Sequence, residues 1–556
     1  MNLSSFGNNG TSKEGNWSGL IQVSFFCFFL MLIGGCSEKA STNPQKPNII
    51  IIYADDVGYG DLSSYGATEI ETPNLDRLAA GGIRFTNAYA TSAMCTPSRY
   101  SLLTGKYAFR HESAGILSAE DPLIIEPGST TLPQMLEEAG YITSIIGKWH
   151  LGLGEKKEPI NWNGEIKAGP LEVGFDQSFI LPVTNDRIPT VFVEGHHVYQ
   201  LSEEDEPLRV KYPEEGDHQY QEQQFGQGDA SSPQVPQPLV GNLPSGHTHP
   251  EKLRYPADAQ HSGTIVNGVS RIGYMSGGHS AWWDDEQMAA TFVEKSESFI
   301  QENSENPFFL YLSLPENHVP RIPNSRFQDS SGTGLRGDAI LELDWVVGEI
   351  LNTLESNTLR DKSLVIFSSD NGPVFFDGYE DGALQKHNGH DPSGIYSGGK
   401  YTAYEGGTRM PTIVSWPGQI EAGTESDALI SQVDLLASLA ALVDVKLHDG
   451  NLDSKNVLDV LMGESEIGRD HLVQQSSDGL ALKKGPWKYI EAGSRSGWAY
   501  NRHNISETPL NTDPLEDHEY LFNLEEDPEE SKNVASKFPE KVKEMRSLLE
   551  EIKQAK

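Results

Sequence analysis

Basic residues are scarce in this sequence. Lysine and arginine number 42 against 80 aspartates and glutamates, which gives a formal net charge of −38. Nucleic-acid binders need a basic surface, so we expect no nucleic-acid partner. The same charge repels polyanions at long range, so a polyanionic substrate would require a locally basic pocket or a salty medium. The simpler interpretation is an acidic surface that keeps a globular protein soluble, since 37% of the residues are hydrophobic and 9% aromatic.

Cysteine is also scarce, and the sequence lacks an apolar run long enough to span a membrane. The apolar run at residues 20–35 is shorter than the roughly 20 residues of a spanning helix. It ends in LIGGC, and the small residues before Cys36 resemble a bacterial lipobox. We expect a signal peptide at residues 1–36, a lipid on Cys36 and a tether at residues 37–46. An uncleaved anchor is the alternative, because Lys13 is the only base before the run.

These expectations place the protein outside the cytoplasm. It would be lipid-anchored in the cell envelope or secreted, and the lipid would be its only contact with a membrane. Of the three cysteines, Cys27 lies in the apolar run and Cys36 is the predicted lipid site, so the mature chain would retain Cys95 as one free thiol. A buried, inert thiol is the simplest interpretation of such a residue.

Apolar runs alternate with amphipathic segments along the chain, which predicts an α/β fold. Residues 48–54 (NIIIIYA) form the short, continuous apolar run of a buried central strand. Thr72-Pro73 is typical of a helix start, and Gly81-Gly82 of its end. Further strands are expected at 141–146, 308–314, 363–368 and 411–415, and a further helix at 131–139.

The composition and hydrophobic periodicity of the sequence change twice along the chain. Residues 202–263 are rich in Glu, Gln, Pro, Gly and His with little periodicity, which predicts an insertion in a catalytic domain at 47–460. Histidines 218, 247, 249 and 261 fit no metal-ligand spacing, so a polar loop is favoured over a second metal site. Residues 461–556 contain short apolar runs and a charged helix at 539–552, which predicts a small α+β domain with an antiparallel sheet.

Polar groups follow the carboxyl ends of several predicted strands. Asp55 and Asp56 follow the first strand, and Asp370 and Asn371 follow the strand at 363–368. The ends of parallel strands share one edge of a sheet, where α/β proteins bind ligands. Oxygen-only ligands suit Ca²⁺ or Mg²⁺, and a cation would relieve the repulsion among three carboxylates. Taken singly, each of these residues could be a turn residue or a helix cap.

Positively charged or protonatable side chains gather at the same predicted edge. Lys148 and His150 follow the strand at 141–146, His318 follows the strand at 308–314, and Lys400 lies further along the chain. They would give an oxyanion a basic lining. Cys95 lies two residues before Pro97, at the start of a predicted helix, where backbone N–H groups favour anions.

Two long motifs support a resemblance to a known family. Residues 95–105 (CTPSRYSLLTG) and 140–150 (GYITSIIGKWH) resemble both signatures of the type I sulfatases of the alkaline-phosphatase superfamily. The likeness continues through residues 370–372 (DNG), 399–407 (GKYTAYEGG), 520–524 (YLFNL) and 527–529 (DPE). It implies an alkaline-phosphatase-like α/β domain with a mostly parallel or mixed sheet flanked by helices, followed by a smaller C-terminal α+β domain.

The resemblance also implies residue roles. A maturation enzyme would oxidise Cys95 to formylglycine, whose hydrate is the nucleophile. The implied ligands of one Ca²⁺ are Asp55, Asp56, Asp370, Asn371 and the modified Cys95. Arg99 and His150 would hold the hydrate. Lys148, His318 and Lys400 would contact the sulfate, with His318 or Lys400 protonating the leaving oxygen.

The predicted substrate is a sulfated glycan, because lipid-anchored bacterial relatives of this type commonly serve polysaccharide breakdown. Two clusters are candidates to bind the sugar, although turn and loop roles are nearly as well supported: Asn185, Asp186 and Arg187, and His387, His390 and Asp391. Two other functions remain open. One is phosphonate or phosphodiester hydrolysis on the same fold, and the other is a sulfoglycan-binding lipoprotein that has lost catalysis. The second would not need an oxidisable thiol at Cys95.

Overall fold

The computed structural model describes residues 46–156, 158–212, 244–447, 453–493 and 518–555. The predicted signal peptide and lipid site, and all of the tether except Lys46, lie outside the described residues and stay predictions. The described residues form a ten-stranded sheet with strand order β15-β2-β14-β13-β1-β12-β4-β5-β6-β7, together with smaller sheets. No helix among these residues is both long enough and apolar enough to span a bilayer.

The centre of the large sheet is parallel. Strand β1 (Asn48–Ala54) pairs on one side with β12 (Phe308–Ser313) and on the other with β13 (Ser363–Ser369). Beyond β12 lie β4 (Ile142–Lys148) and β5 (Gln177–Leu181), also parallel. The predicted central strand is confirmed: all seven residues of β1 are buried, as its unbroken apolar run requires.

The outer strands make the sheet mixed. On the β13 side these are β14 (Thr412–Ser415), β2 (Ile83–Phe85) and β15 (Thr424–Ser426), and on the β5 side β6 (Val193–Glu194) and β7 (His197–Val198). Antiparallel pairing joins β13 to β14, β14 to β2, β5 to β6 and β6 to β7. The predicted mostly parallel or mixed sheet is therefore confirmed.

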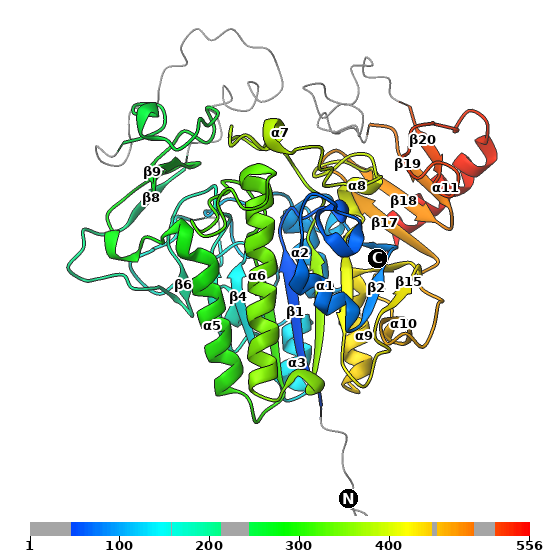
Figure 1. Cartoon of the computed structure of the whole chain (residues 1–556), viewed down its shortest axis with the longest axis horizontal. Coiled ribbons are helices and arrows are strands. Elements are labelled where there is room, and N and C mark those ends of the chain that lie inside the picture. Colours follow the sequence, from blue (N-terminus) through cyan, green and yellow to red (C-terminus); the bar gives the residue numbers. More distant parts are fainter. Residues whose placement is uncertain (1–45, 157, 213–243, 448–452, 494–517, 556) are drawn as a thin grey trace, which may run out of the picture. The chain divides into compact units, whose positions relative to one another are not determined.

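Helices cover both faces of this sheet (Figure 1). Ile50 and Ile52 of β1 pack in a core with residues of α1 (Pro73–Ala80), α5 (Met288–Glu302) and α6 (Gly334–Ser356). Ile49 and Ile51 face the opposite way. Their core includes residues of α2 (Cys95–Thr104), α3 (Leu132–Glu138) and α9 (Leu435–Leu442). Alternate side chains of one strand thus serve two cores, which gives the three-layer α/β fold.

A second, antiparallel sheet lies near the C-terminus, as predicted. It consists of β17 (His471–Gln475), β18 (Leu480–Lys484), β19 (Trp487–Ile490) and β20 (Tyr520–Asn523). Helix α11 (Pro539–Gln554) packs Val542, Met545 and Leu549 into its core. The backbone N–H of Gln475 donates a hydrogen bond of 2.8 Å to the Thr91 carbonyl oxygen, so β17 supports the loop that leads into Cys95.

Short strands lie within the predicted insertion and directly after it. Strand β8 (Arg209–Lys211) pairs with β11 (Tyr274–Ser276), and β9 (Ile265–Val266) with β10 (Val269–Ser270). Residues 213–243 lie outside the described part of the chain. The domain boundaries proposed from the sequence, at residues 202, 263 and 461, remain predictions.

Candidate active site

The predicted site residues meet at the carboxyl edge of the central sheet, because neighbouring parallel strands end there together. Ala54 of β1 is in register with Ser369 of β13, so Asp55 and Asp370 emerge side by side. Lys148 is the last residue of β4. Nine of the predicted residues here are almost entirely buried, with exposed fractions of 2% or less: Asp55, Asp56, Cys95, Arg99, Lys148, His150, Asp370, Asn371 and Lys400.

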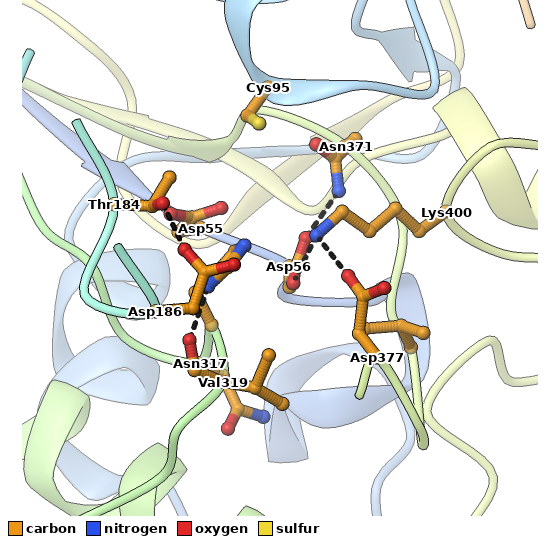
Figure 2. Close-up of polar contacts among 12 residues, drawn as sticks. Asp55, Asp56, Cys95, Thr184, Asp186, Asn317, Val319, Asn371, Asp377 and Lys400 are labelled. Atoms are coloured by element: carbon orange, nitrogen blue, oxygen red, sulfur yellow. Dashed lines mark hydrogen bonds and ion pairs between the residues drawn. The ribbon is translucent and has the colours of Figure 1, made fainter. Parts of the chain in front are cut away.

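Each of the three buried carboxylates is paired with a buried cation. Lys148 contacts Asp55, Arg99 binds Asp370 through two nitrogens at 2.7 and 3.0 Å, and Lys400 Nζ lies 2.9 Å from Asp56 Oδ2. Figure 2 shows Lys400 extending toward Asp56, with Asn371 approaching the same carboxylate. The cluster thus holds three carboxylates and three cations in close contact, all of them buried.

Two oxygens in this cluster have no hydrogen-bond partner. They are Asp55 Oδ1 and Asn371 Oδ1, both on wholly buried residues. Asn371 Nδ2 donates to Asp56 Oδ1 at 2.7 Å, which leaves its carbonyl oxygen as the spare ligand. Burial, and then the charge of Asp370, raise the pKa of Asp55 despite Lys148. Unsatisfied hard oxygens beside crowded carboxylates fit a hard divalent cation.

A histidine lies beside the same carboxylates. His318, Asp55 and Asp56 each place a potential ligand atom within 4.8 Å of the others. The predicted ligand set did not include His318, which was expected to contact the sulfate. Its Nδ1 lies 2.6 Å from the carbonyl oxygen of Val319, an acceptor, so Nδ1 carries the proton and Nε2 is left to face other partners.

Cys95 is the first residue of α2, as predicted, and is buried. Its Sγ lies 3.4 Å from His150 Nδ1. His150 Nε2 is 3.0 Å from the Leu117 carbonyl oxygen, which can only accept, so Nε2 carries the proton. Burial, and then Lys148 and Arg187, lower the pKa of His150, so the ring is neutral and Nδ1 presents a lone pair to the sulfur. Burial raises the pKa of the Cys95 thiol, which makes the unmodified cysteine a poor nucleophile.

The 185–187 turn follows β5 and adjoins this region. Asn185 Nδ2 donates to the carbonyl oxygens of His318 and Pro320, both at 3.3 Å. Asp186 accepts from Thr184 and from Arg187 Nη1, the latter at 2.9 Å. The Arg187 side chain is 15% exposed, and its charge acts on the pKa of His150. The structure therefore brings this predicted sugar-binding turn to the basic lining.

The second predicted sugar-binding cluster has contacts of another kind. His390 is buried, and its Nε2 lies 2.8 Å from Asp61 Oδ1, which also binds Arg336 at 2.5 Å. His387 Nδ1 lies 3.2 Å from the His390 carbonyl oxygen, and Asp391 Oδ1 accepts from the backbone N–H of Ser393. These bonds stabilise the loop between α7 (Ala383–Lys386) and Lys400. A role in binding sugar stays a prediction.

Asp377 was not predicted from the sequence. Its Oδ2 lies 3.0 Å from Lys400 Nζ and 2.9 Å from the Tyr401 hydroxyl, and its side chain is 18% exposed. Figure 2 places it beside Lys400, on the opposite side of Asp56 from Asp186. Burial opposes a charged Lys400, but Asp377 and then Asp56 raise its pKa well above the usual value. Lys400 therefore remains an ammonium ion.

Comparison with known proteins agrees with this geometry. The family model described as Sulfatase matches residues 47–445. An N-acetylgalactosamine-6-O-sulfatase of Bacteroides thetaiotaomicron is 46% identical over 530 residues, covering 94% of this chain and 97% of the relative. Human arylsulfatase A is 30% identical over 526 residues, with coverage of 91% and 87%.

The fold is also similar to that of a solved structure. A B. thetaiotaomicron protein, described in connection with the metabolism of multiple glycosaminoglycans and labelled 6S-sulf, superposes with a TM-score of 0.83 at 46% identity. The alignment covers 92% of this chain and 100% of that one. The similarity thus extends from the central sheet through the C-terminal region.

Proposed function

The chain belongs to the sulfatase family and is a sulfuric ester hydrolase, and we propose that it removes sulfate from carbohydrate by means of a formylglycine at position 95. The observation that carries the proposal is the environment of Cys95. The residue lies at a helix N-terminus, 3.4 Å from a neutral histidine and beside a cluster of buried cations and carboxylates. The raised pKa of its thiol supports an oxidised form as the working species.

The cation that fits the site is Ca²⁺ or Mg²⁺, and we infer Ca²⁺ from the family. Asp55, Asp56, Asp370 and Asn371 would hold it together with the modified Cys95. Two of their oxygens are free to bind it without breaking any present hydrogen bond. A bound cation would supply charge for the sulfonyl oxygens and the nucleophile. His318 lies close enough to join the ligands or to contact the sulfate.

Other side chains of the site would bind the sulfate and transfer protons. His150 presents its Nδ1 lone pair to position 95 and can accept a proton there. Lys148 and Lys400 offer ammonium groups to the sulfate, while Arg99 is held by Asp370 and Ser313. His318 and Lys400 are the two candidates to protonate the sugar oxygen, which is a poor leaving group without a proton. Lys400 is already an ammonium ion, whereas burial, and then Lys400, lower the pKa of His318, so His318 Nε2 would first have to take up a proton.

For the substrate we propose a 6-O-sulfated N-acetylgalactosamine unit. The support is the B. thetaiotaomicron relative that bears this activity in its name and covers nearly the whole chain. The 185–187 turn would bind the sugar, because it carries a partly exposed arginine beside the site. Export and lipid attachment through Cys36 and maturation by a formylglycine-generating enzyme belong to the same proposal.

The test is a panel of sulfated mono- and oligosaccharides, with free sulfate as the readout. We expect release from 6-O-sulfated N-acetylgalactosamine, and slower or no release from isomers sulfated elsewhere. Aryl phosphodiesters and phosphonates belong in the same panel, because the rival function predicts that they are preferred. A protein that hydrolyses these and no sulfate ester would contradict the proposal, as would one that binds sulfated glycans without turnover.

A further inference from the structure

His261 lies at the end of the segment expected to be a polar loop, yet its side chain is only 4% exposed. Both of its ring nitrogens face carboxylates. Nδ1 lies 2.7 Å from Asp258 Oδ1, and Nε2 lies 3.4 Å from Asp186 Oδ2. A carboxylate can only accept, so this arrangement is satisfied when both nitrogens carry protons and the ring is cationic. Burial opposes the charge, but Asp186 and Asp258 raise the pKa of His261 to about 9.

The segment around His261 also binds the backbone of the 185–187 turn. Arg271 Nε donates to the Asn185 carbonyl oxygen at 2.8 Å, and the Ile272 N–H donates to that of Asp186 at 2.9 Å. The Ile188 N–H returns a bond of 3.2 Å to the Ile272 carbonyl oxygen. The insertion flank is therefore a scaffold for this turn, and His261 is the charged side chain that reaches the Asp186 carboxylate.

The same segment holds the loop that carries Asp377. The Asp258 N–H donates to the Gly378 carbonyl oxygen at 2.8 Å, and the Tyr379 hydroxyl donates to the Ser270 carbonyl oxygen at 2.9 Å. The rings of His261 and Tyr379 have centroids 4.8 Å apart. Gly378 has a φ of +92°, and a Cβ there would come within 2.0 Å of His261 Nδ1, so the close contact requires glycine.

We propose that His261 is a positioning residue for sugar recognition, which fixes Asp186 and, through it, Arg187 against the substrate. The proposal rests on the proposed function, since it assigns the 185–187 turn to the sugar part of a sulfated carbohydrate. Asp186 has Arg187 as its partner on one side and His261 on the other. Without His261, the buried Asp186 carboxylate would lose a cationic partner and reorient, and the Arg187 guanidinium would move with it.

The site has two parts, one for the sulfate and one for the sugar. The sulfate pocket is built by Lys148, Lys400 and the acidic cluster, none of which contacts His261 in the bonds described above. Inorganic sulfate would occupy this pocket alone, whereas a sulfated sugar would also touch the 185–187 turn. A change at His261 should therefore alter the KM for sugar while leaving the inhibition constant of inorganic sulfate unchanged.

The experiment compares His261→Gln with the wild-type protein on 6-O-sulfated N-acetylgalactosamine, with inorganic sulfate as the competitive inhibitor. We expect KM to rise about 30-fold, as for loss of one partner of a buried charge pair, and the sulfate Ki to change less than about twofold. His249→Gln is the matched control. It lies in the same segment, its ring bonds to the neighbouring Thr248 hydroxyl, and it should leave both constants unchanged.

Two further variants are needed. One is a milder change that keeps the fold, and the other tests whether His261 acts on KM through Asp186. Asp258→Asn removes the outer, 29%-exposed partner and should raise KM less than His261→Gln while the melting temperature stays near that of the wild type. The double variant His261→Gln/Asp186→Asn should be no worse than the poorer single variant, because both changes break one contact.

The outcomes are separable. An unchanged KM in His261→Gln, an equal rise in KM and Ki, or additive effects in the double variant would each overturn the positioning role. If His261→Gln does not fold, the positioning role is tested with Asp258→Asn, by its KM for the sulfated sugar and its Ki for inorganic sulfate. A wild-type protein that releases no sulfate from any sulfated sugar would instead overturn the proposed function and, with it, this inference.

Discussion

Removing the bound cation should weaken the fold as well as abolish turnover, and the size of the effect follows from the unpaired oxygens. Asp55 Oδ1 and Asn371 Oδ1 are buried without partners. Each such acceptor costs about 1–3 kcal/mol when unsatisfied, so a cation that binds both should stabilise the folded state by about 2–6 kcal/mol. Relief of the repulsion between Asp55 and Asp370 would add to this.

The expected shift in melting temperature is modest because the chain is long. For 556 residues, an unfolding entropy of about 2.1 cal/mol/K per residue corresponds to roughly 1 °C for each kcal/mol. Exhaustive chelation should therefore lower the melting temperature by roughly 2–6 °C, and Ca²⁺ should restore both stability and activity better than Zn²⁺.

The assay is thermal unfolding with and without chelator, with metal content measured on the same samples. Asp370→Asn is the variant to compare, because it removes one ligand charge while keeping the side-chain shape. Its melting temperature should respond less to Ca²⁺ than that of the wild-type protein. Full activity and an unchanged melting temperature in protein shown to be free of metal would refute the cation site.

Three other predictions concern single side chains. His318→Ala should reduce hydrolysis of sugar sulfates far more than of activated aryl sulfates, since a phenolate leaves without a proton; equal losses would assign His318 to binding. Asp377→Asn should lower kcat on both kinds of substrate by about tenfold, because Lys400 loses its outer partner; an effect on sugar alone would contradict this. Burial, and then Glu316, raise the pKa of Glu342 to about 8. The folded state then holds a proton that the unfolded state lacks, so stability should fall as pH rises from about 5 to 8, and less so in Glu342→Gln. If the melting temperatures of the wild-type protein and of Glu342→Gln change with pH in the same way across this range, the prediction is wrong.

The site residues that follow the carboxyl ends of strands were the ones best predicted from the sequence. Asp55 and Asp370 follow β1 and β13, which are adjacent parallel strands, so their proximity follows from the sheet edge. The place of Cys95 at the start of α2 likewise follows from local signals around Pro97. Both depend on short-range patterns that any buried parallel strand or helix start displays.

The residues that sequence missed act through contacts between distant segments. Asp377 contacts Lys400 across 23 positions of the chain, and His261 contacts Asp186 across 75. Neither lies in a periodic element or a motif, so only the folded loops bring them together. His261 lies in a turn of the segment expected to be a polar loop, but its burial was not predicted, and two carboxylates compensate the cost of that burial.

Mass spectrometry of residue 95 in active protein tests the central claim most directly. Trypsin cleaves after Arg84 and Arg99, so the peptide spans residues 85–99 and contains Cys95. If Cys95 is matured to formylglycine, this peptide is lighter than encoded, because sulfur and two hydrogens leave and one oxygen enters, and it reacts with hydrazides. Cys95→Ala should be inactive in any host. An unmodified cysteine in that peptide from fully active enzyme would contradict the account.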